Sequence, residues 1–164
     1  MPGAGFATGG DMIRTIALAT LVAGTLDILM AIIDTSLSGG NVAGMLASVA
    51  SGPFGDGIRE NAAAAPLGLL VHFAIMAVMA AVYVLAATRI PLLTRYWWIA
   101  GPLYGVGLFI VMYWLVLPAR FEGFAPPSEA IGIAKGLFAH CVLVGLPIAW
   151  ITARARPAIR QSYI

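Results

Sequence analysis

Charged side chains are scarce in this sequence: Asp, Glu, Lys and Arg make up 10% of its 164 residues, and 61% of the residues are hydrophobic. An ordinary soluble domain carries about 25% charged residues. A chain of this length exposes a large surface, and so few charges cannot cover it, which argues against a soluble protein. The composition also excludes a disordered or collagen-like chain. The net charge of +2 is too small to predict a nucleic-acid partner.

Cysteine and catalytic motifs are also nearly absent. Cys141 is the single cysteine, which excludes a disulfide framework within the chain and a multi-cysteine zinc or iron–sulfur site. The sequence contains no Walker A, GxGxxG, GxSxG or HExxH pattern. We therefore expect a non-enzyme more than an enzyme, and no motif predicts a cofactor.

Long hydrophobic runs are the abundant feature. A helix needs about 20 mostly apolar residues to cross a bilayer. Four runs meet this length: Met12–Asp34, Pro66–Thr88, Trp97–Pro118 and Ile133–Ala153. Because backbone polar groups in lipid need internal partners, such runs must be helical. The sequence therefore predicts an all-α integral membrane four-helix bundle that forms one domain over residues 1–164.

The longest connection, Thr35–Ala65, contains a further apolar stretch that is too short to span a membrane. Ser38 or Asn41 could cap a helix at its start. The glycine- and proline-rich stretch Gly52–Gly57 would end that helix. We therefore expect a short interfacial or re-entrant helix in the first outer loop.

The distribution of basic residues predicts the orientation, because Lys and Arg are enriched in cytoplasmic loops. The side with more basic residues holds Arg14, Arg89, Arg95, Arg154, Arg156 and Arg160, and the other side holds Arg59, Arg120 and Lys135. Both termini are thus expected in the cytoplasm. The cluster Arg154, Arg156 and Arg160 is expected to contact anionic lipid.

Small residues within the spans predict close helix packing, because helices associate in lipid where backbones can approach one another. Gly101 and Gly105 lie four residues apart in the third span, and the second span is rich in alanine. Gly24 belongs to a stripe of small and polar residues in the first span. These patterns indicate a tight bundle.

Polar side chains of three or four spans fall at one depth. Asp27, His72 and His140 each lie about two turns from the outer end of their span, roughly 10 Å below the outer surface at 1.5 Å per residue. Tyr113 of the third span lies slightly nearer that surface. Placing an Asp within a span raises the free energy of membrane insertion by roughly 2.5–3.5 kcal/mol. We therefore expect a structural or functional role for the polar residues of this layer.

Three interpretations of this layer compete. Asp27 could accept a hydrogen bond from His72, His140 or Tyr113 and hold the bundle in register. The same groups could form a proton or ion path, because buried carboxyl and imidazole groups can exchange a proton. His72, His140 and Asp27 also match the two-histidine, one-carboxylate set of ligands that binds metal ions. Haem held between the two histidines is the less expected form of this interpretation.

These interpretations predict different functions. The leading hypothesis is a polytopic membrane protein that handles a small solute, proton or metal ion at the Asp/His layer. The alternative is an accessory or scaffold subunit of a membrane complex, and the third is a redox or metal-dependent membrane enzyme. Because four helices are few for a complete transporter, we expect a homo-oligomer or a larger membrane complex embedded in the bilayer.

Four stretches carry a resemblance to known proteins: Ala50–Gly55, Leu67–Phe73, Gly101–Gly105 and His140–Pro147. They resemble a group of bacterial four-helix inner-membrane proteins of unassigned function. The chain is also distantly similar to the YagU-like inner-membrane proteins, which place a histidine in their second and last spans. The resemblance implies a bacterial cytoplasmic membrane location and adds weight to His72 and His140.

Overall fold

The computed structural model describes residues 9–155, and within that range the secondary structure is entirely helical. Four segments are long and apolar enough to cross a membrane. They are α1 (Gly9–Leu37), α3 (Ala64–Arg89), a third segment (Trp97–Arg120) and a fourth segment (Ala130–Ala155). The four predicted hydrophobic runs are therefore confirmed as long helices, which extend slightly beyond those runs.

The third and fourth segments each contain a π-helical stretch. The third consists of α5 (Trp97–Ile110), the π-helix η2 (Val111–Val116) and α6 (Leu117–Arg120), and the fourth of α7 (Ala130–Phe138), the π-helix η3 (Ala139–Gly145) and α8 (Leu146–Ala155). Each stretch leads into a Leu-Pro pair, and the leucine N–H bonds to the carbonyl five residues earlier. Since proline lacks an N–H and its ring displaces the carbonyl four residues before it, the wider π turn accommodates the pair.

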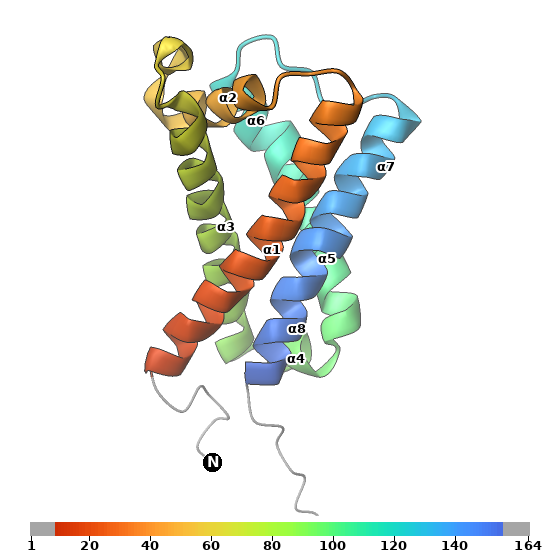
Figure 1. Cartoon of the computed structure of the whole chain (residues 1–164). Coiled ribbons are helices and arrows are strands. Elements are labelled where there is room, and N and C mark those ends of the chain that lie inside the picture. The colour runs from red at the N-terminus through yellow and green to blue at the C-terminus, as the bar shows by residue number, and fades with distance from the viewer. Residues whose placement is uncertain (1–8, 156–164) are drawn as a thin grey trace, which may run out of the picture.

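The long segments form one bundle with distinct ends (Figure 1). α1 packs against α3 and α8, while α5 packs against η3 and α8. We call the end where α1 begins and α8 ends the terminal end, and the opposite end, which α2 (Val42–Phe54) crosses, the α2 end. Small residues fill the centre, and Ala19, Ala23, Ala80 and Ala149 are fully buried. The alanine-rich packing predicted from the sequence is thus present.

Helix α2 begins at the predicted cap, because the Gly44 N–H donates to Asn41 Oδ1 at 3.1 Å. It ends at Gly55, whose φ of 82° suits glycine. The short 3₁₀ helix η1 (Asp56–Glu60) then leads towards α3. α2 lies directly on α3, since a Cβ added at Gly68 would overlap the Leu46 carbonyl oxygen. This contact places α2 across one end of the bundle.

Helix α5 follows α3 after the single turn of α4 (Leu92–Arg95) and packs closely on the fourth segment. A Cβ at Gly105 would overlap the His140 carbonyl oxygen, and one at Gly101 would lie 2.9 Å from that of Gly145. The spacing of Gly101 and Gly105 therefore serves a backbone contact with η3, as the predicted small-residue packing requires.

Candidate functional site

A cavity of about 1000 Å³ lies between α3 and the third segment, beneath α2. The four polar residues predicted to share one depth all line it, and they come from the four long segments: Asp27, His72, Tyr113 and His140. The rest of the lining is mainly apolar and includes Met45, Met76, Met79 and Met112. Its volume is at the upper end of ligand pockets, which span about 300–1000 Å³. The predicted polar residues therefore surround a space.

The cavity opens sideways, and residues of α2 line it at the α2 end. Val78 of α3 and Val116 of η2 line it, yet they are 64% and 40% exposed on the outside of the bundle. The opening therefore lies between α3 and the third segment. Asp27 and His140 belong to α1 and η3, which pack against each other.

His72 is held in one ring orientation. Its Nε2 lies 2.9 Å from the carbonyl oxygen of Gly24, and a carbonyl can only accept, so Nε2 carries the proton. Nδ1 is then a bare acceptor in the neutral ring, and it lies 4.0 Å from Asp27 Oδ2. The contact forms because the small residue at Gly24 lets α3 approach α1 closely. A second ring proton, if present, would be directed at Asp27.

Asp27 is exposed to the cavity. Its side chain is 22% exposed, and no described residue donates a hydrogen bond to its carboxylate. His72 and His140 both interact with it electrostatically. A carboxylate used only to hold the bundle would accept hydrogen bonds from the packed helices, and this one does not.

His140 has a comparable arrangement on the opposite wall. Its Nδ1 donates to the Gly136 carbonyl of its own helix at 2.9 Å, which leaves Nε2 as the acceptor of the neutral ring. The ring packs edge-on against Tyr113, with centroids 6.0 Å apart, and against Phe109, at 5.8 Å. Phe109 reaches this position because Gly136 leaves room for its ring. Both histidines thus offer one free ring nitrogen.

The two π-helical stretches carry site residues. Met112 and Tyr113 lie in η2, and His140 lies in η3. A π turn shifts the face on which the following residues point, and π turns occur often at functional sites. The sequence offered one usable signal for them, the repeated Leu-Pro pair at Leu117 and Leu146, which the prediction did not use.

Arg59 and Arg120 hold α2 over the cavity through hydrogen bonds, a role that was not predicted from the sequence. Arg120 donates from Nε to the Gly52 carbonyl at 2.6 Å and from Nη2 to the Ser51 carbonyl. Arg59 donates to Ser51 Oγ at 3.0 Å. Asp56 pairs with Arg59 at 3.4 Å and with Arg120 at 3.7 Å. Carbonyls at a helix C-terminus lack intrahelical partners, and Arg120 supplies one to Gly52. It adds a second bond to the Ser51 carbonyl, which also accepts from the Gly55 N–H, so Arg120 caps α2 from the third segment.

No group of three His, Cys, Asp or Glu side chains among residues 9–155 is close enough to hold a metal ion. His72 and His140 do have the orientation seen in metal ligands, because each donates its other ring N–H to a carbonyl. The metal or haem interpretation of Asp27, His72 and His140 stays a prediction.

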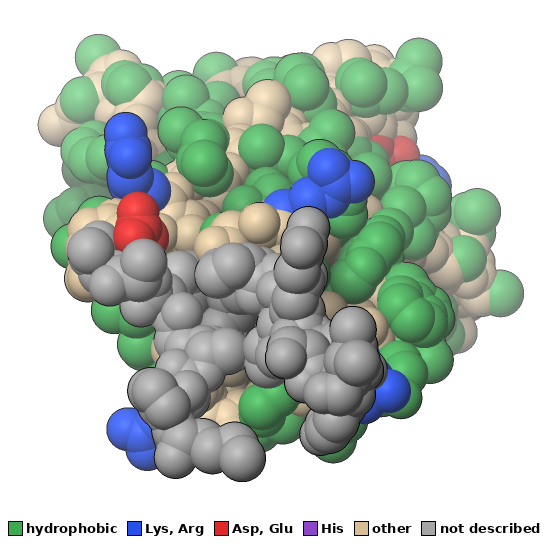
Figure 2. Space-filling model, turned by 90° about the horizontal axis from the view of Figure 1, so that it is seen from below, with side chains coloured by type: hydrophobic (Ala, Val, Ile, Leu, Met, Phe, Trp, Pro, Cys, Tyr) green, Lys and Arg blue, Asp and Glu red, His purple; other side chains and the backbone are tan. Residues whose placement is uncertain are grey.

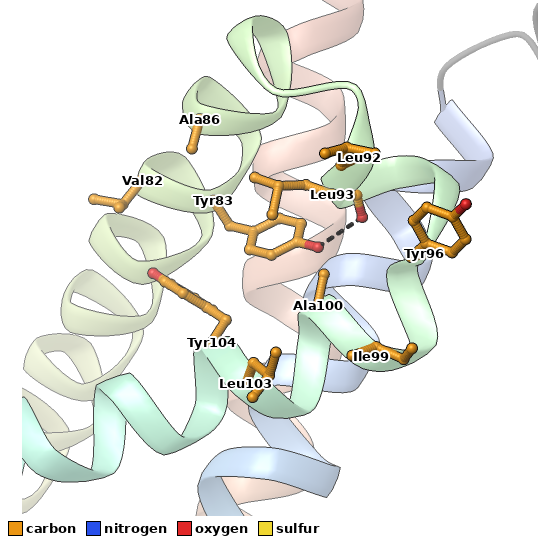
Figure 3. A pocket seen from close by; sticks show the side chains of 10 residues that line it. All are labelled: Val82, Tyr83, Ala86, Leu92, Leu93, Tyr96, Ile99, Ala100, Leu103 and Tyr104. Carbon is orange, nitrogen blue, oxygen red and sulfur yellow. Dashed lines mark hydrogen bonds between the residues drawn. The ribbon is translucent and has the colours of Figure 1, made fainter.

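A second, apolar cavity of about 500 Å³ lies further towards the terminal end, again between α3 and α5 (Figure 3). Tyr104 lines this cavity and donates from its hydroxyl to the Met79 carbonyl at 2.8 Å, and Met79 lines the first cavity. Tyr83 lies beside it, with ring centroids 5.1 Å apart, and bonds to the Leu93 carbonyl at 3.0 Å. The tyrosine pair therefore separates two cavities along one helix interface.

The terminal end is basic. Figure 2 shows Lys and Arg side chains around this end with hydrophobic side chains beyond them, and the described basic residues here are Arg14, Arg89, Arg95 and Arg154. The Arg154 guanidinium lies over the Trp150 ring, 4.9 Å from its centroid. The other two members of the predicted lipid-binding cluster, Arg156 and Arg160, lie outside the described residues.

Comparisons of the chain with protein-family models, with curated proteins and with solved structures found no match. The resemblance to YagU-like proteins stays a prediction.

Proposed function

We propose that the chain is a multi-pass protein of the bacterial cytoplasmic membrane that binds a small solute in the cavity between α3 and the third segment. Asp27, His72 and His140 hold a hydrogen-bond donor of that solute and exchange a proton with it. The proposed role is binding and passage of a solute rather than a chemical conversion.

The observation that carries this proposal is the shared cavity. Asp27, His72, Tyr113 and His140 come from four segments and line one space of about 1000 Å³. If the layer served only to hold the bundle together, its polar groups would be buried against each other and hydrogen-bonded. An unbonded carboxylate facing a cavity is instead typical of a site that waits for a ligand or a proton.

The chemistry of the Asp/His layer favours a solute that carries a hydrogen-bond donor. With Asp27 ionised and both rings neutral, three groups of the layer are acceptors: the carboxylate and the free ring nitrogens of His72 and His140. The Tyr113 hydroxyl of the same layer can donate or accept. The three acceptors match an N–H or O–H group of a solute, or a proton. At 4.0 Å, Asp27 and His72 are close enough to share one proton after a small side-chain movement.

The orientation we propose places the termini in the cytoplasm and the α2 end outside, with α2 as an interfacial helix. It is supported by the basic residues of the terminal end and by the acidic residues of the α2 end, which are Asp34, Asp56, Glu60, Glu122 and Glu129. The cavity then lies in the outer half of the membrane.

The proton part of the proposal is tested by infrared difference spectroscopy of the full chain in lipid, recorded between acidic and neutral medium. We expect a protonated-carboxyl band from Asp27 that disappears in Asp27→Asn and changes its midpoint pH in His72→Gln. The ionisable groups around Asp27 are His72, His140 and Tyr113, and Arg59 and Arg120 line the same cavity.

Asp34→Asn is the matched control for this experiment. Asp34 lies two turns further along α1, is paired with Lys135, and does not line the cavity. It should lose only a surface-carboxyl signal and keep the Asp27 band. Identical difference spectra for the wild type and Asp27→Asn would show that Asp27 does not exchange a proton and would overturn the proposal.

The other functions predicted from the sequence stay predictions: an accessory or scaffold subunit, and a redox or metal-dependent membrane enzyme. The same holds for a homo-oligomer or larger complex and for anionic lipid at the tail.

A further inference from the structure

We propose that the solute is an amphiphile with an anionic, hydroxyl-bearing headgroup, which enters sideways between α3 and the third segment. Its anionic group binds at Arg59 and Arg120, and its hydroxyl groups are the donors for Asp27, His72 and His140. This inference rests on the proposed function, because it identifies the ligand class of the same cavity. It goes beyond that function by assigning a headgroup site to two residues outside the Asp/His layer.

The sideways opening is the first observation. Val78 and Val116 line the cavity and are also exposed on the outside of the bundle. In a bilayer this surface meets acyl chains, so a ligand with an apolar tail can enter without crossing water. The lining between the valines is apolar and rich in methionine, which adapts to ligands of varied shape.

The two guanidinium groups are the second observation. The two groups share Ser51 as a hydrogen-bond partner, because Arg120 donates to its carbonyl and Arg59 donates to its hydroxyl. Both lie against the Phe121 ring, 4.8 Å from its centroid for Arg120 and 6.0 Å for Arg59. They form a cationic rim at the α2 end of the cavity, whose lining is mainly apolar outside the Asp/His layer.

Some guanidinium N–H groups of Arg59 and Arg120 are not used in the hydrogen bonds to α2. Arg120 uses Nε and Nη2, Arg59 uses Nη2, and no described residue accepts a hydrogen bond from Nη1 of either side chain. Asp56 contacts both guanidiniums, which leaves a net positive charge in the cluster. Free guanidinium N–H groups bind phosphate and carboxylate oxygens well. The rim therefore fits an anionic headgroup beside an apolar tail.

The test is a binding titration of the purified full chain in neutral detergent with three probes. They are phosphatidylglycerol, phosphatidylcholine with identical acyl chains, and glycerol phosphate as the free headgroup. Native mass spectrometry counts the bound molecules. We expect phosphatidylglycerol to bind about tenfold more tightly than phosphatidylcholine, the size of one charge-assisted hydrogen bond, and glycerol phosphate to bind far more weakly than either.

Two variants separate the headgroup from the tail. Arg59→Gln should remove most of the preference for phosphatidylglycerol, and it costs α2 only one hydrogen bond, to the Ser51 hydroxyl. Arg120 is left intact because it donates to two carbonyls of α2. Val78→Trp should fill the opening and weaken both lipids. The controls are Lys135→Gln, which removes a charge paired with Asp34 outside the cavity, and Val82→Trp, which adds the same bulk one turn away in the second cavity. Both controls should bind like the wild type.

The contrary outcomes are distinct. Equal binding of the two lipids, or an unchanged preference in Arg59→Gln, overturns the headgroup assignment. Tight binding of glycerol phosphate alone overturns the amphiphile and indicates a site for free anions. If Val78→Trp abolishes lipid binding while Arg59→Gln does nothing, the cavity remains the ligand site and the proposed function stands. If neither variant changes binding, lipids do not occupy this cavity, and the infrared titration of Asp27 decides the proposed function separately.

Discussion

Helix α5 forms two interfaces of opposite character. Towards η3 and α8, Gly101 and Gly105 bring backbones into direct contact; we call this the glycine interface. Towards α3, Tyr83 and Tyr104 pack against each other and line the second cavity (Figure 3), and Met79, whose carbonyl accepts from Tyr104, lines the first; we call this the tyrosine interface. Helices in lipid gain contact where small residues allow close approach. The two interfaces therefore differ in role: we expect most of the stability from the glycine interface, while the cavities lie at the tyrosine interface.

The largest effect is expected from breaking the glycine interface. In Gly105→Ala the new methyl group overlaps the His140 carbonyl, so the fourth segment must move. We expect the free energy of unfolding to fall by about 1–3 kcal/mol, as measured by denaturant titration in detergent. Gly107→Ala is the control, because nothing lies within 4 Å of a Cβ there. Equal stabilities would contradict the backbone contact.

The next largest effect is expected where Arg120 holds α2 over the first cavity. Arg120→Gln loses the charged donors that cap α2, and we expect α2 to be held about 2 kcal/mol less firmly. Amide hydrogen exchange within Val42–Phe54 should accelerate, while exchange in α5 stays unchanged. Lys135→Gln removes an exposed charge and should leave α2 protected. Unchanged protection in Arg120→Gln would show that packing on α3 alone holds α2.

A smaller effect, with an informative sign, is expected at Asp27. If the carboxylate faces a cavity without hydrogen bonds, Asp27→Asn removes an expensive charge from a span. Stability should then equal that of the wild type or rise by about 1 kcal/mol. Thermal unfolding in detergent measures the difference. A clear loss of stability would instead assign Asp27 to holding the bundle together.

The smallest effect is expected at the partition between the two cavities. Tyr104→Phe loses one hydrogen bond to the Met79 carbonyl, which in membrane proteins is worth about 0.6 kcal/mol. Tyr83→Phe loses its bond to Leu93 instead and serves as the comparison. If the tyrosine interface is a weak contact, both variants should remain folded with nearly unchanged stability. A loss as large as that of Gly105→Ala would erase the contrast between the interfaces.

Much of the fold follows from the sequence, because hydrophobic runs of membrane length must be helical. The depth of Asp27, His72, His140 and Tyr113 also follows, since each helical residue adds a fixed rise of about 1.5 Å. Asn41 was identifiable as a cap by its position before a short apolar run. These features depend only on local sequence and helix geometry.

The space around the polar layer could not be predicted. It depends on contacts between α3 and α5, such as the packing of Tyr83 against Tyr104 and the bond from Tyr104 to the Met79 carbonyl, which the local sequence does not specify. Arg120 was interpreted as an orientation charge, because nothing local shows that it reaches Ser51 and Gly52 of α2. The sequence thus placed the polar residues at one depth, but predicted neither the cavity that they line nor the contacts that hold α2 over it.

The most direct test of the account asks whether water reaches the cavity wall in the third segment. Met112→Cys, which lines the cavity, and Leu108→Cys, which lies in the core, are each introduced into Cys141→Ser and treated with N-ethylmaleimide in lipid vesicles. Because only a thiolate formed in contact with water reacts quickly, Met112→Cys should be labelled many times faster than Leu108→Cys. Equal, slow labelling at both positions would show a dry, closed interface and contradict the account.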